Sequence, residues 1–385
     1  MRGSIRVGRI LGVPIFLHFT LLFIMLLFAY VFGFTSGSIF GFELGYGQLP
    51  LDWPWLLLLG AIAAVLFFAS VLVHELAHSY YAIRRGYVIS GITLFIFGGV
   101  SQIEKAPENA PGEGVMAFVG PLTSLVIGAV TLPIYLLIQD ASGNVALQAA
   151  AITVSIVSFY NLFLGAFNLI PAFPMDGGRV LRAYLAKRMS FLRATELAAN
   201  IGRVAAVVLA VVGILFSIFL AFVAIFIYIA AGEELRETRI HEALKGIKAR
   251  DIMTRNYSTV TSQDTVATVL AKMIGEKRTA FPVVDGQDLV GLVTTDEVGR
   301  VAEKDRPITL VARIMSSPVQ GVSPETEATD VVERMSASKS FNVPVMEDGN
   351  LVGFITQADI ARTVQIAMET SRGRGSRPSP GANKP

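Results

Sequence analysis

Two histidines four residues apart, His74 and His78, stand on either side of Glu75 within a long apolar stretch. On a helix, residues i and i+4 share one face, so both imidazoles can reach one metal ion. Glu75 is one step around the helix, where it can reach a water on the metal but is poorly placed as a ligand. This H-E-x-x-H pattern is typical of metal-dependent hydrolysis with the glutamate as general base.

The alternative is that these three residues are polar groups packing between helices. Their location argues against it, because an ionisable side chain costs roughly 2.5–3.5 kcal/mol at the centre of a membrane span, and less toward its end. A sequence seldom carries three such groups in one span without a use. We therefore interpret His74, Glu75 and His78 as a metal site.

Two histidines do not complete a hydrolytic zinc site, which uses three protein ligands and a water. The chain has no cysteine, and its other histidines are His18 and His241. Both are candidates, although packing between spans is the default for His18 and solvent exposure is the default for His241. A carboxylate, Asp176, is the better third ligand. The alternative for Asp176 is an N-cap of a helix starting near Arg179.

Asp176 lies in the segment Asn168-Leu-Ile-Pro171-Ala-Phe-Pro174-Met-Asp176-Gly-Gly. The two prolines break a helix, and the glycines allow tight turns. Irregular backbone of this kind is tolerated at membrane depth where it lines a water-filled cavity. The segment follows a predicted span that ends on the same side of the membrane as His78.

The elements that position these residues are membrane spans. Hydrophobic residues make up 53% of the 385 residues and charged residues 16%, against about 45–50% and 25% in soluble proteins. A net charge of +2 is too even for a nucleic-acid binder that works by bulk charge. Since a span needs about 20 apolar residues, we predict six, at 12–34, 54–82, 114–138, 145–168, 196–213 and 215–232. The last two are divided near Gly213, and one long tilted helix is the alternative.

Basic residues indicate the orientation of the spans. Arginines and lysines precede the first span and follow the second, fourth and sixth, whereas the loops 35–53 and 139–144 contain none. The positive-inside rule then places both termini in the cytoplasm.

The second half of the chain contains an internal repeat with an offset of 62 residues, for example Ile252-Met253 with Ile314-Met315. In each copy a helix pattern precedes two short β-rich runs, and a second helix follows. The predicted helices are 266–274 and 328–335, and the predicted strands are 280–284, 289–294, 342–346 and 351–356.

The motifs H-E-L-A-H and N-L-I-P-A-F-P-M-D-G-G-R together resemble the site-2 protease family of intramembrane zinc metalloproteases, over about residues 1–238. The resemblance implies that His74, His78 and Asp176 bind one zinc ion and that Glu75 is the general base. It implies that Asn168 contacts substrate or supports the oxyanion, and that Pro171 and Pro174 shape the loop. Gly98 and Gly99 lie in a β-rich stretch that in the family forms a membrane-associated hairpin near the catalytic cleft.

The repeat resembles a pair of cystathionine-β-synthase (CBS) domains, over about 250–368. In that family a Thr-x-x-Asp at the end of a strand binds the phosphate and ribose of adenine nucleotides. The resemblance assigns these roles to Thr356 and Asp359. The first copy has Thr294, but Glu297 replaces the aspartate, so one intact site for ATP, ADP or AMP is expected. The alternative is a purely structural or dimerising pair.

The sequence thus predicts a polytopic α-helical membrane protein with a small membrane-associated β element and a cytosolic α/β CBS pair. Its predicted function is hydrolysis of membrane-anchored proteins within the bilayer of the plasma membrane, regulated by adenine nucleotide, in a homodimer formed through the CBS domains. The alternatives are a transporter with a CBS pair and a catalytically inactive relative that binds membrane partners. The expected divisions are a protease domain 1–238, a linker 239–249, CBS domains 250–308 and 309–368, and a disordered tail 369–385.

Overall fold

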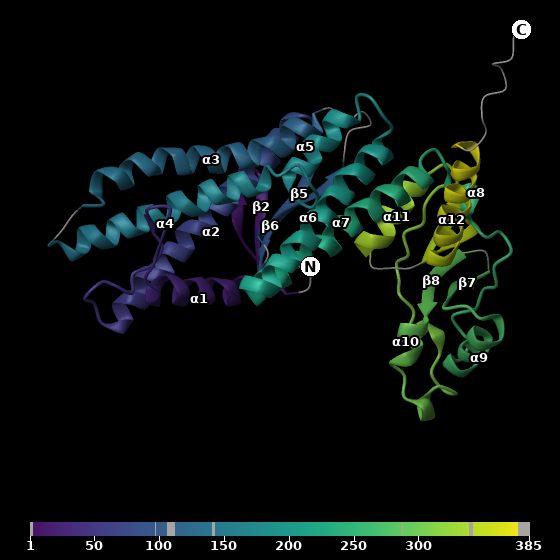
Figure 1. Cartoon of the computed structure of the whole chain (residues 1–385). Coiled ribbons are helices and arrows are strands. Elements are labelled where there is room, and N and C mark those ends of the chain that lie inside the picture. The colour runs from purple at the N-terminus through teal and green to yellow at the C-terminus, as the bar shows by residue number, and fades with distance from the viewer. Residues whose placement is uncertain are drawn as a thin grey trace, which may run out of the picture. The chain divides into compact units, whose positions relative to one another are not determined.

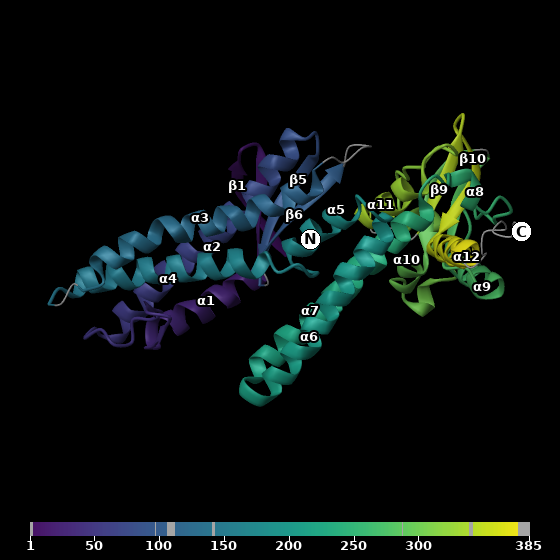
Figure 2. The ribbon, with the colours of Figure 1, turned by 45° about the horizontal axis from the view of Figure 1, so that its top comes forward.

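The computed structural model describes residues 3–96, 98–105, 112–140, 143–286, 288–338 and 342–375. The chain forms two compact units, 1–236 and 237–385, and each is described here by itself. Figures 1 and 2 show long helices and a small sheet in the first unit, and short helices and strands in the second.

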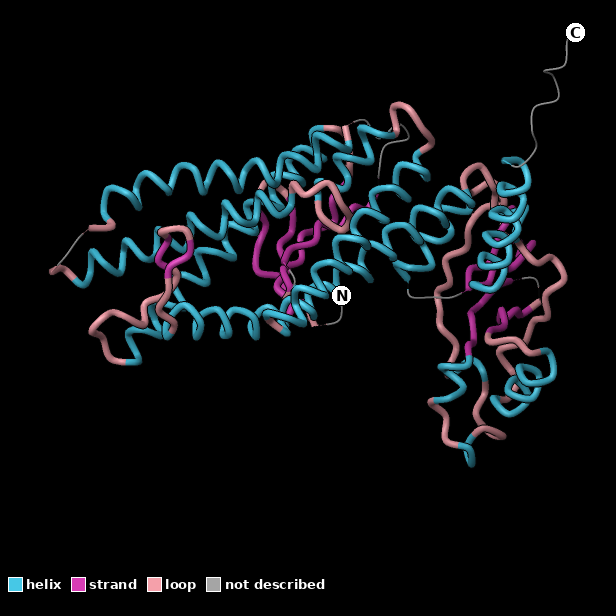
Figure 3. The backbone as a smooth tube through the Cα atoms, in the orientation of Figure 1, coloured by secondary structure: helices cyan, strands magenta, loops and turns pink. Residues whose placement is uncertain are grey.

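The sheet of the first unit has the strand order β1-β2-β5-β6. Figure 3 draws the strands of the chain in magenta. Strands β1 (Ser4–Ile10) and β2 (Val13–His18) form a hairpin, and β2 runs parallel to β5 (Val88–Phe95), which pairs antiparallel with β6 (Gly98–Lys105). Within this unit, the sequence predicts strands only in the β-rich stretch around Gly98 and Gly99. The first hairpin, which turns at Leu11 and Gly12, both with positive φ, was missed.

The missed hairpin corrects the first predicted span. Helix α1 (Phe19–Phe34) begins at residue 19 rather than 12, because residues 13–18 pair as a strand and His18 caps the helix through a hydrogen bond from the backbone N–H of Thr20. The helix has 16 residues, a length of about 24 Å. The loop after α1 contains the short strands β3 (Ser38–Ile39) and β4 (Phe42–Glu43).

Four of the described helices are long and apolar enough to cross a membrane by length and composition. They are α2 (Trp53–Arg84), α3 (Glu113–Ile138), α4 (Val145–Asn168) and α6 (Phe191–Phe216). Helix α6 ends at Phe216 with Ser217 as its C-cap, and α7 (Ile218–Leu244) follows at once. The single long helix is therefore wrong, and the division falls four residues beyond Gly213.

Glycines allow the helices around α2 to approach closely. A Cβ on Gly60 of α2 would meet the backbone of Ala29 and Gly33 on α1. Likewise, a Cβ on Gly165 of α4 would meet the carbonyl oxygen of Pro121 on α3. Small residues serve this purpose where the lipid gives helices no hydrophobic reason to associate. Close packing fixes α2 and α3, and these two helices carry most of the site described below.

The second unit consists of the predicted repeat. The first copy contains α9 (Val266–Glu276), β7 (Ala280–Asp285), β8 (Asp288–Thr294) and α10 (Thr295–Gly299). The second contains α11 (Ala328–Ser338), β9 (Asn342–Glu347), β10 (Asn350–Thr356) and α12 (Gln357–Gly375). The predicted helix–strand–strand–helix order and positions are confirmed in both copies. Remaining short elements are α8 (Ala249–Ile252) and 3-10 turns at Glu303–Asp305 and Val311–Arg313.

The first residues of each copy pair with a strand of the other copy. Thr254 forms a β-bridge with Phe354, and Ser316 forms one with Leu292. In the same way, Val311 is buried in the core of the first copy. Helix α12 continues to Gly375, past residue 369, where the tail was expected to begin, and residues 376–385 lie outside the described part of the chain.

Candidate metal centre

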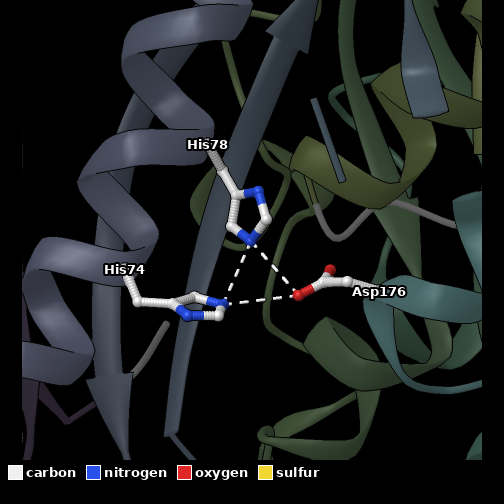
Figure 4. A group of neighbouring side chains, drawn as sticks. All are labelled: His74, His78 and Asp176. Atoms are coloured by element: carbon white, nitrogen blue, oxygen red, sulfur yellow. Dashed lines mark hydrogen bonds and ion pairs between the residues drawn. The ribbon is translucent and has the colours of Figure 1, made fainter. Parts of the chain in front are cut away.

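Three ligand atoms from two distant parts of the sequence meet beside α2 (Figure 4). The Nε2 atoms of His74 and His78 are 3.2 Å apart, and Asp176 Oδ2 is 3.3 Å from each. In a tetrahedral zinc site with bonds of about 2.0–2.1 Å, neighbouring ligand atoms are about 3.3–3.4 Å apart. The three atoms therefore have the spacing and chemistry of three zinc ligands.

Asp176 is the first residue of α5 (Asp176–Leu185), and the N-cap is Met175. The alternative of Asp176 as an N-cap is therefore wrong, as is a helix start near Arg179. A tight turn precedes the helix: a Cβ on Gly177 would meet the carbonyl oxygens of Leu169 and Ile170. The glycine thus lets the chain fold back far enough for the carboxylate to reach the histidines.

The second nitrogen of each histidine is held by α3. His74 Nδ1 lies 2.9 Å from Ser124 Oγ, and His78 Nδ1 lies 2.6 Å from the carbonyl oxygen of Met116. A carbonyl only accepts, so Nδ1 of His78 carries the hydrogen and Nε2 offers its lone pair to the centre. Sequence reasoning missed Ser124 and Met116. A helical pattern alone could not show that α3 turns this face toward α2.

Gly120 on α3 provides room for an ion. A Cβ at this position would meet Nε2 of both histidines. A side chain of any size is therefore excluded from the space beside the ligand atoms. Gly120 lies in the third turn of α3, against the metal cluster.

Glu75 lies on the side of the cluster where β6 passes. Its Oε2 accepts a hydrogen bond of 3.1 Å from Ser101 Oγ, and a Cβ on Gly99 would meet its Cγ and Cδ. Gly99 thus lies against the Glu75 side chain, and Gly98 adopts a φ of +124°, which favours glycine.

The other sequence candidates lie elsewhere. The side-chain amide of Asn168, the last residue of α4, donates to the carbonyl oxygen of Leu164 in its own helix. Pro171 is exposed and Pro174 is half-buried. His18 caps α1, and His241 is exposed on α7. Neither histidine belongs to the group of possible metal ligands found among the described residues.

A buried arginine anchors the helix that carries Asp176. Arg182 on α5 pairs with Glu113 of α3 and, at 3.0 Å, with Glu234 of α7, and its guanidinium lies over the Phe173 ring. Breaking such a buried pair by removing one partner costs about 3–5 kcal/mol. This network therefore ties α5 to both α3 and α7.

In the second unit the two Thr–acid pairs have the same geometry. Thr356 donates to Asp359 from both its N–H and its hydroxyl group, at 2.9 and 2.7 Å. Thr294 donates to Glu297 in the same two ways, and Ser316 adds a third hydrogen bond of 3.0 Å. Burial acts to raise the pKa of Glu297, but the hydrogen bonds from Thr294 and Ser316 outweigh it and lower that pKa.

A bundle of apolar helices that holds two histidines and an aspartate at zinc spacing, beside a glutamate, has the composition of a membrane-bound metalloprotease. The family model of peptidase family M50 matches residues 62–209, and that of the CBS domain matches 249–302 and 311–366. The chain is 36% identical to zinc metalloprotease MJ0392 of Methanocaldococcus jannaschii over 95% of its own length and 97% of that protein.

Rip3 of Mycobacterium tuberculosis is 33% identical, over 95% of this chain and 94% of its own. A solved site-2 protease of M. jannaschii is 36% identical, over 60% of this chain and 95% of its own, with a TM-score of 0.42. The chain therefore belongs to peptidase family M50, the site-2 proteases, and carries a CBS pair.

Proposed function

We propose that this protein is a zinc-dependent intramembrane protease whose zinc ion is held by His74, His78 and Asp176. The observation that supports it most directly is the near-equilateral triangle of ligand atoms, 3.2–3.3 Å on each side, with both Nδ1 atoms held from behind. A transporter would not need a glutamate beside such a triangle. An inactive relative would not need the complete set of ligands.

Zinc bound there would polarise a peptide carbonyl and lower the pKa of a water molecule to about 7. Glu75 takes the proton from the attacking water and then delivers it to the leaving amide nitrogen. Because Glu75 follows His74 directly on α2, its carboxylate stays next to the cluster through both proton transfers.

The substrate is a membrane-anchored protein whose helix must unwind before its carbonyl groups are free for attack. Strand β6 is the last strand of its sheet, so an unwound segment can add to it by backbone hydrogen bonds near Gly98 and Gly99. Asn168 contacts this segment or supports the oxyanion, which requires it to release its bond to Leu164. Pro171 and Pro174 shape the loop that leads to Asp176.

The decisive experiment uses Glu75→Gln in the full-length protein, reconstituted in vesicles with single-span membrane proteins. Peptides released from those proteins are identified by mass spectrometry, and bound zinc is measured in the same sample. We expect Glu75→Gln to retain zinc and to lose turnover by about 10²–10⁴-fold, the range for general acid–base catalysis. Glu43→Gln serves as the control, because Glu43 is a half-buried glutamate on β4 whose carboxylate accepts a hydrogen bond from Gln48 and lies outside the metal cluster. Unchanged cleavage by Glu75→Gln with zinc retained would overturn the proposal.

The natural substrates can be found in cells with the same variant. Membrane-anchored proteins that accumulate uncut when Glu75→Gln replaces the parent protein are the candidates. Transcription regulators and remnant signal peptides both fit the chemistry, because each offers a peptide bond within a single span.

The CBS pair is proposed to regulate the protease by binding adenine nucleotide at Thr356 and Asp359. A carboxylate accepts from both ribose hydroxyl groups, and the start of a helix favours phosphate. Calorimetry of ATP, ADP and AMP with the full-length protein tests the proposal, with Asp359→Ala as the disabled site. Absence of binding to the parent protein would leave the structural alternative, and equal loss in Glu297→Ala would indicate that both copies bind.

The proposed placement is the plasma membrane, with six spans and both termini in the cytoplasm. The proposed divisions are a protease domain 1–238, a linker 239–249, CBS domains 250–308 and 309–368 and a terminal segment 369–385 whose first residues belong to α12, with dimerisation through the CBS domains. The chain has no cysteine, so single cysteines introduced into the loops 35–53 and 139–144 and into both termini can be labelled from one side. Labelling of the termini and of those loops from the same side would contradict the orientation. Light scattering in detergent, with and without residues 239–385, tests the dimer.

A further inference from the structure

We infer that Ser101 on β6 is a positioning residue for Glu75, and that it fixes which carboxylate oxygen takes the proton. The inference rests on the proposed protease function. Ser101 Oγ donates to Glu75 Oε2 at 3.1 Å. Among the described residues it is the hydrogen-bond partner that the structure shows for the Glu75 carboxylate.

Ser79 on α2 completes the arrangement. Its hydroxyl lies 2.9 Å from Ser101 Oγ, and Ser79 is almost fully buried, with an exposed fraction of 1%. Since the Ser101 hydrogen points to Glu75, the Ser79 hydroxyl donates to Ser101. A hydroxyl rotates freely when alone, but a second donor on its oxygen limits the directions of its own hydrogen.

The helix and the strand are arranged around this contact. Glu75 and Ser79 are four residues apart on α2 and so share one face of the helix, the face on which β6 packs. Gly99, two residues before Ser101, leaves space for the Glu75 side chain, because a Cβ there would meet Glu75 Cγ. Alternating residues of a strand share a face, so Gly99 provides the space and Ser101 provides the hydrogen bond.

The hydrogen bond from Ser101 occupies one of the two carboxylate oxygens of Glu75, and this affects which oxygen can take the proton. With Oε2 accepting from Ser101, Oε1 is the oxygen that remains to accept the proton from water. Three rotatable bonds give a free glutamate several rotamers, whereas the bond from Ser101 holds one of them. Ser101 thus links proton transfer to the strand that we propose binds the substrate.

The test compares Ser101→Ala with Ser101→Thr, which keeps the hydroxyl group and suits a strand. We expect Ser101→Ala to lower kcat by about 10–100-fold, the range for losing an outer hydrogen-bond partner at a metal site, with KM unchanged. Ser101→Thr should recover most of the rate. Zinc content and resistance to a chelator should match the parent protein in both variants. Ser90→Ala, on the neighbouring strand β5, should leave all three quantities unchanged.

A double mutant separates positioning from general structural damage. If Ser101 acts through Glu75, then Ser101→Ala in the Glu75→Gln background lowers the residual rate by less than about twofold. Additive losses in the double mutant would overturn the inference, as would a rise in KM at constant kcat. If Glu75→Gln leaves the rate unchanged, the protease proposal itself fails. If Glu75→Gln is inactive and Ser101→Ala equals the parent, only the role of Ser101 fails.

Discussion

Acidic residues in the first turn of a helix are used differently in the two units. Asp176 begins α5, Glu297 lies in the first turn of α10, and Asp359 lies in the first turn of α12. Asp176 reaches two histidines about a hundred positions away in sequence. Glu297 and Asp359 instead accept hydrogen bonds from the threonine three residues before them.

The difference lies in the residue at the helix N-cap. A threonine followed three residues later by an acid forms a capping box, in which the acid satisfies the backbone of its own N-cap residue. Met175, the N-cap of α5, makes no side-chain cap bond, so nothing local holds the Asp176 carboxylate. An acid in the first turn of a helix without a hydroxyl partner can thus turn its whole carboxylate toward distant ligands. A capped acid has one oxygen, Oδ2 of Asp359 or Oε2 of Glu297, committed to its own N-cap threonine.

Removing each acid in turn tests most directly whether Asp176 serves the metal cluster and the capped acids do not. We expect Asp176→Ala to lose zinc and cleavage together, by more than the about 10–100-fold that loss of an outer partner costs. Asp359→Ala should keep the zinc content of the parent, measured by atomic emission on the purified protein. Retention of zinc by Asp176→Ala would mean that another group completes the site.

The two units also differ in the space around a helical glycine, which is filled by the metal cluster at Gly120 and open at Gly275. Gly120→Ala should lower zinc affinity at least about tenfold, because ligand displacement of even a few tenths of an ångström exceeds the tolerance of a zinc site. Gly275, a helical glycine of α9 with open space around its Cβ position, serves as the control. Gly275→Ala should be neutral or stabilise by about 0.5–1 kcal/mol. Competition with a chelator gives the affinities, and equal values for the parent and Gly120→Ala would contradict the steric argument.

The hydrogen bond between Ser124 Oγ and His74 Nδ1 gives a further test of what holds the metal cluster. Ser124→Ala removes the partner of Nδ1 and should lower zinc affinity about 10-fold, toward the lower end of the range for such partners. Ser158→Ala is the control, because this buried serine of α4 donates to the carbonyl oxygen of Gly128 instead. A similar drop in both variants would point to general loosening of the helices.

These contrasts also show which parts of the site the sequence could predict. His74 and His78 are four residues apart on one helix, so their spacing alone predicted a shared face, with Glu75 one step around the helix. Asp176 could be proposed because the breaks at Pro171 and Pro174 left a carboxylate on the appropriate side of the membrane. The repeat could be predicted in detail, because duplication shows the same helix and strand pattern twice at an offset of 62 residues.

Contacts across elements could not be read in this way. Ser101 and Ser124 are ordinary polar residues in sequence, and their roles depend on which face of β6 or α3 turns toward α2. The first hairpin was missed because residues 13–18 are apolar and continue into α1, so hydrophobicity gave no boundary. The break at Ser217 was misplaced for the same reason: apolar residues continue on both sides of it.

The smallest expected effect concerns the capped acids themselves. Glu297→Ala and Asp359→Ala should each weaken the first turn of their helix by about 0.5–2 kcal/mol, the usual value of an N-terminal cap. Amide hydrogen exchange at the starts of α10 and α12 in the full-length protein measures this. The folded-state pKa of Glu297 is lowered, so its contribution is complete above the unfolded value of about 4.3 and is lost as the pH falls through the lower folded value. The difference between Glu297→Ala and the parent should therefore be full at pH 7 and shrink only below about pH 4.3. If it shrinks already between pH 7 and 5, Glu297 is not held as a carboxylate by Thr294, and the contrast with Asp176 would not hold.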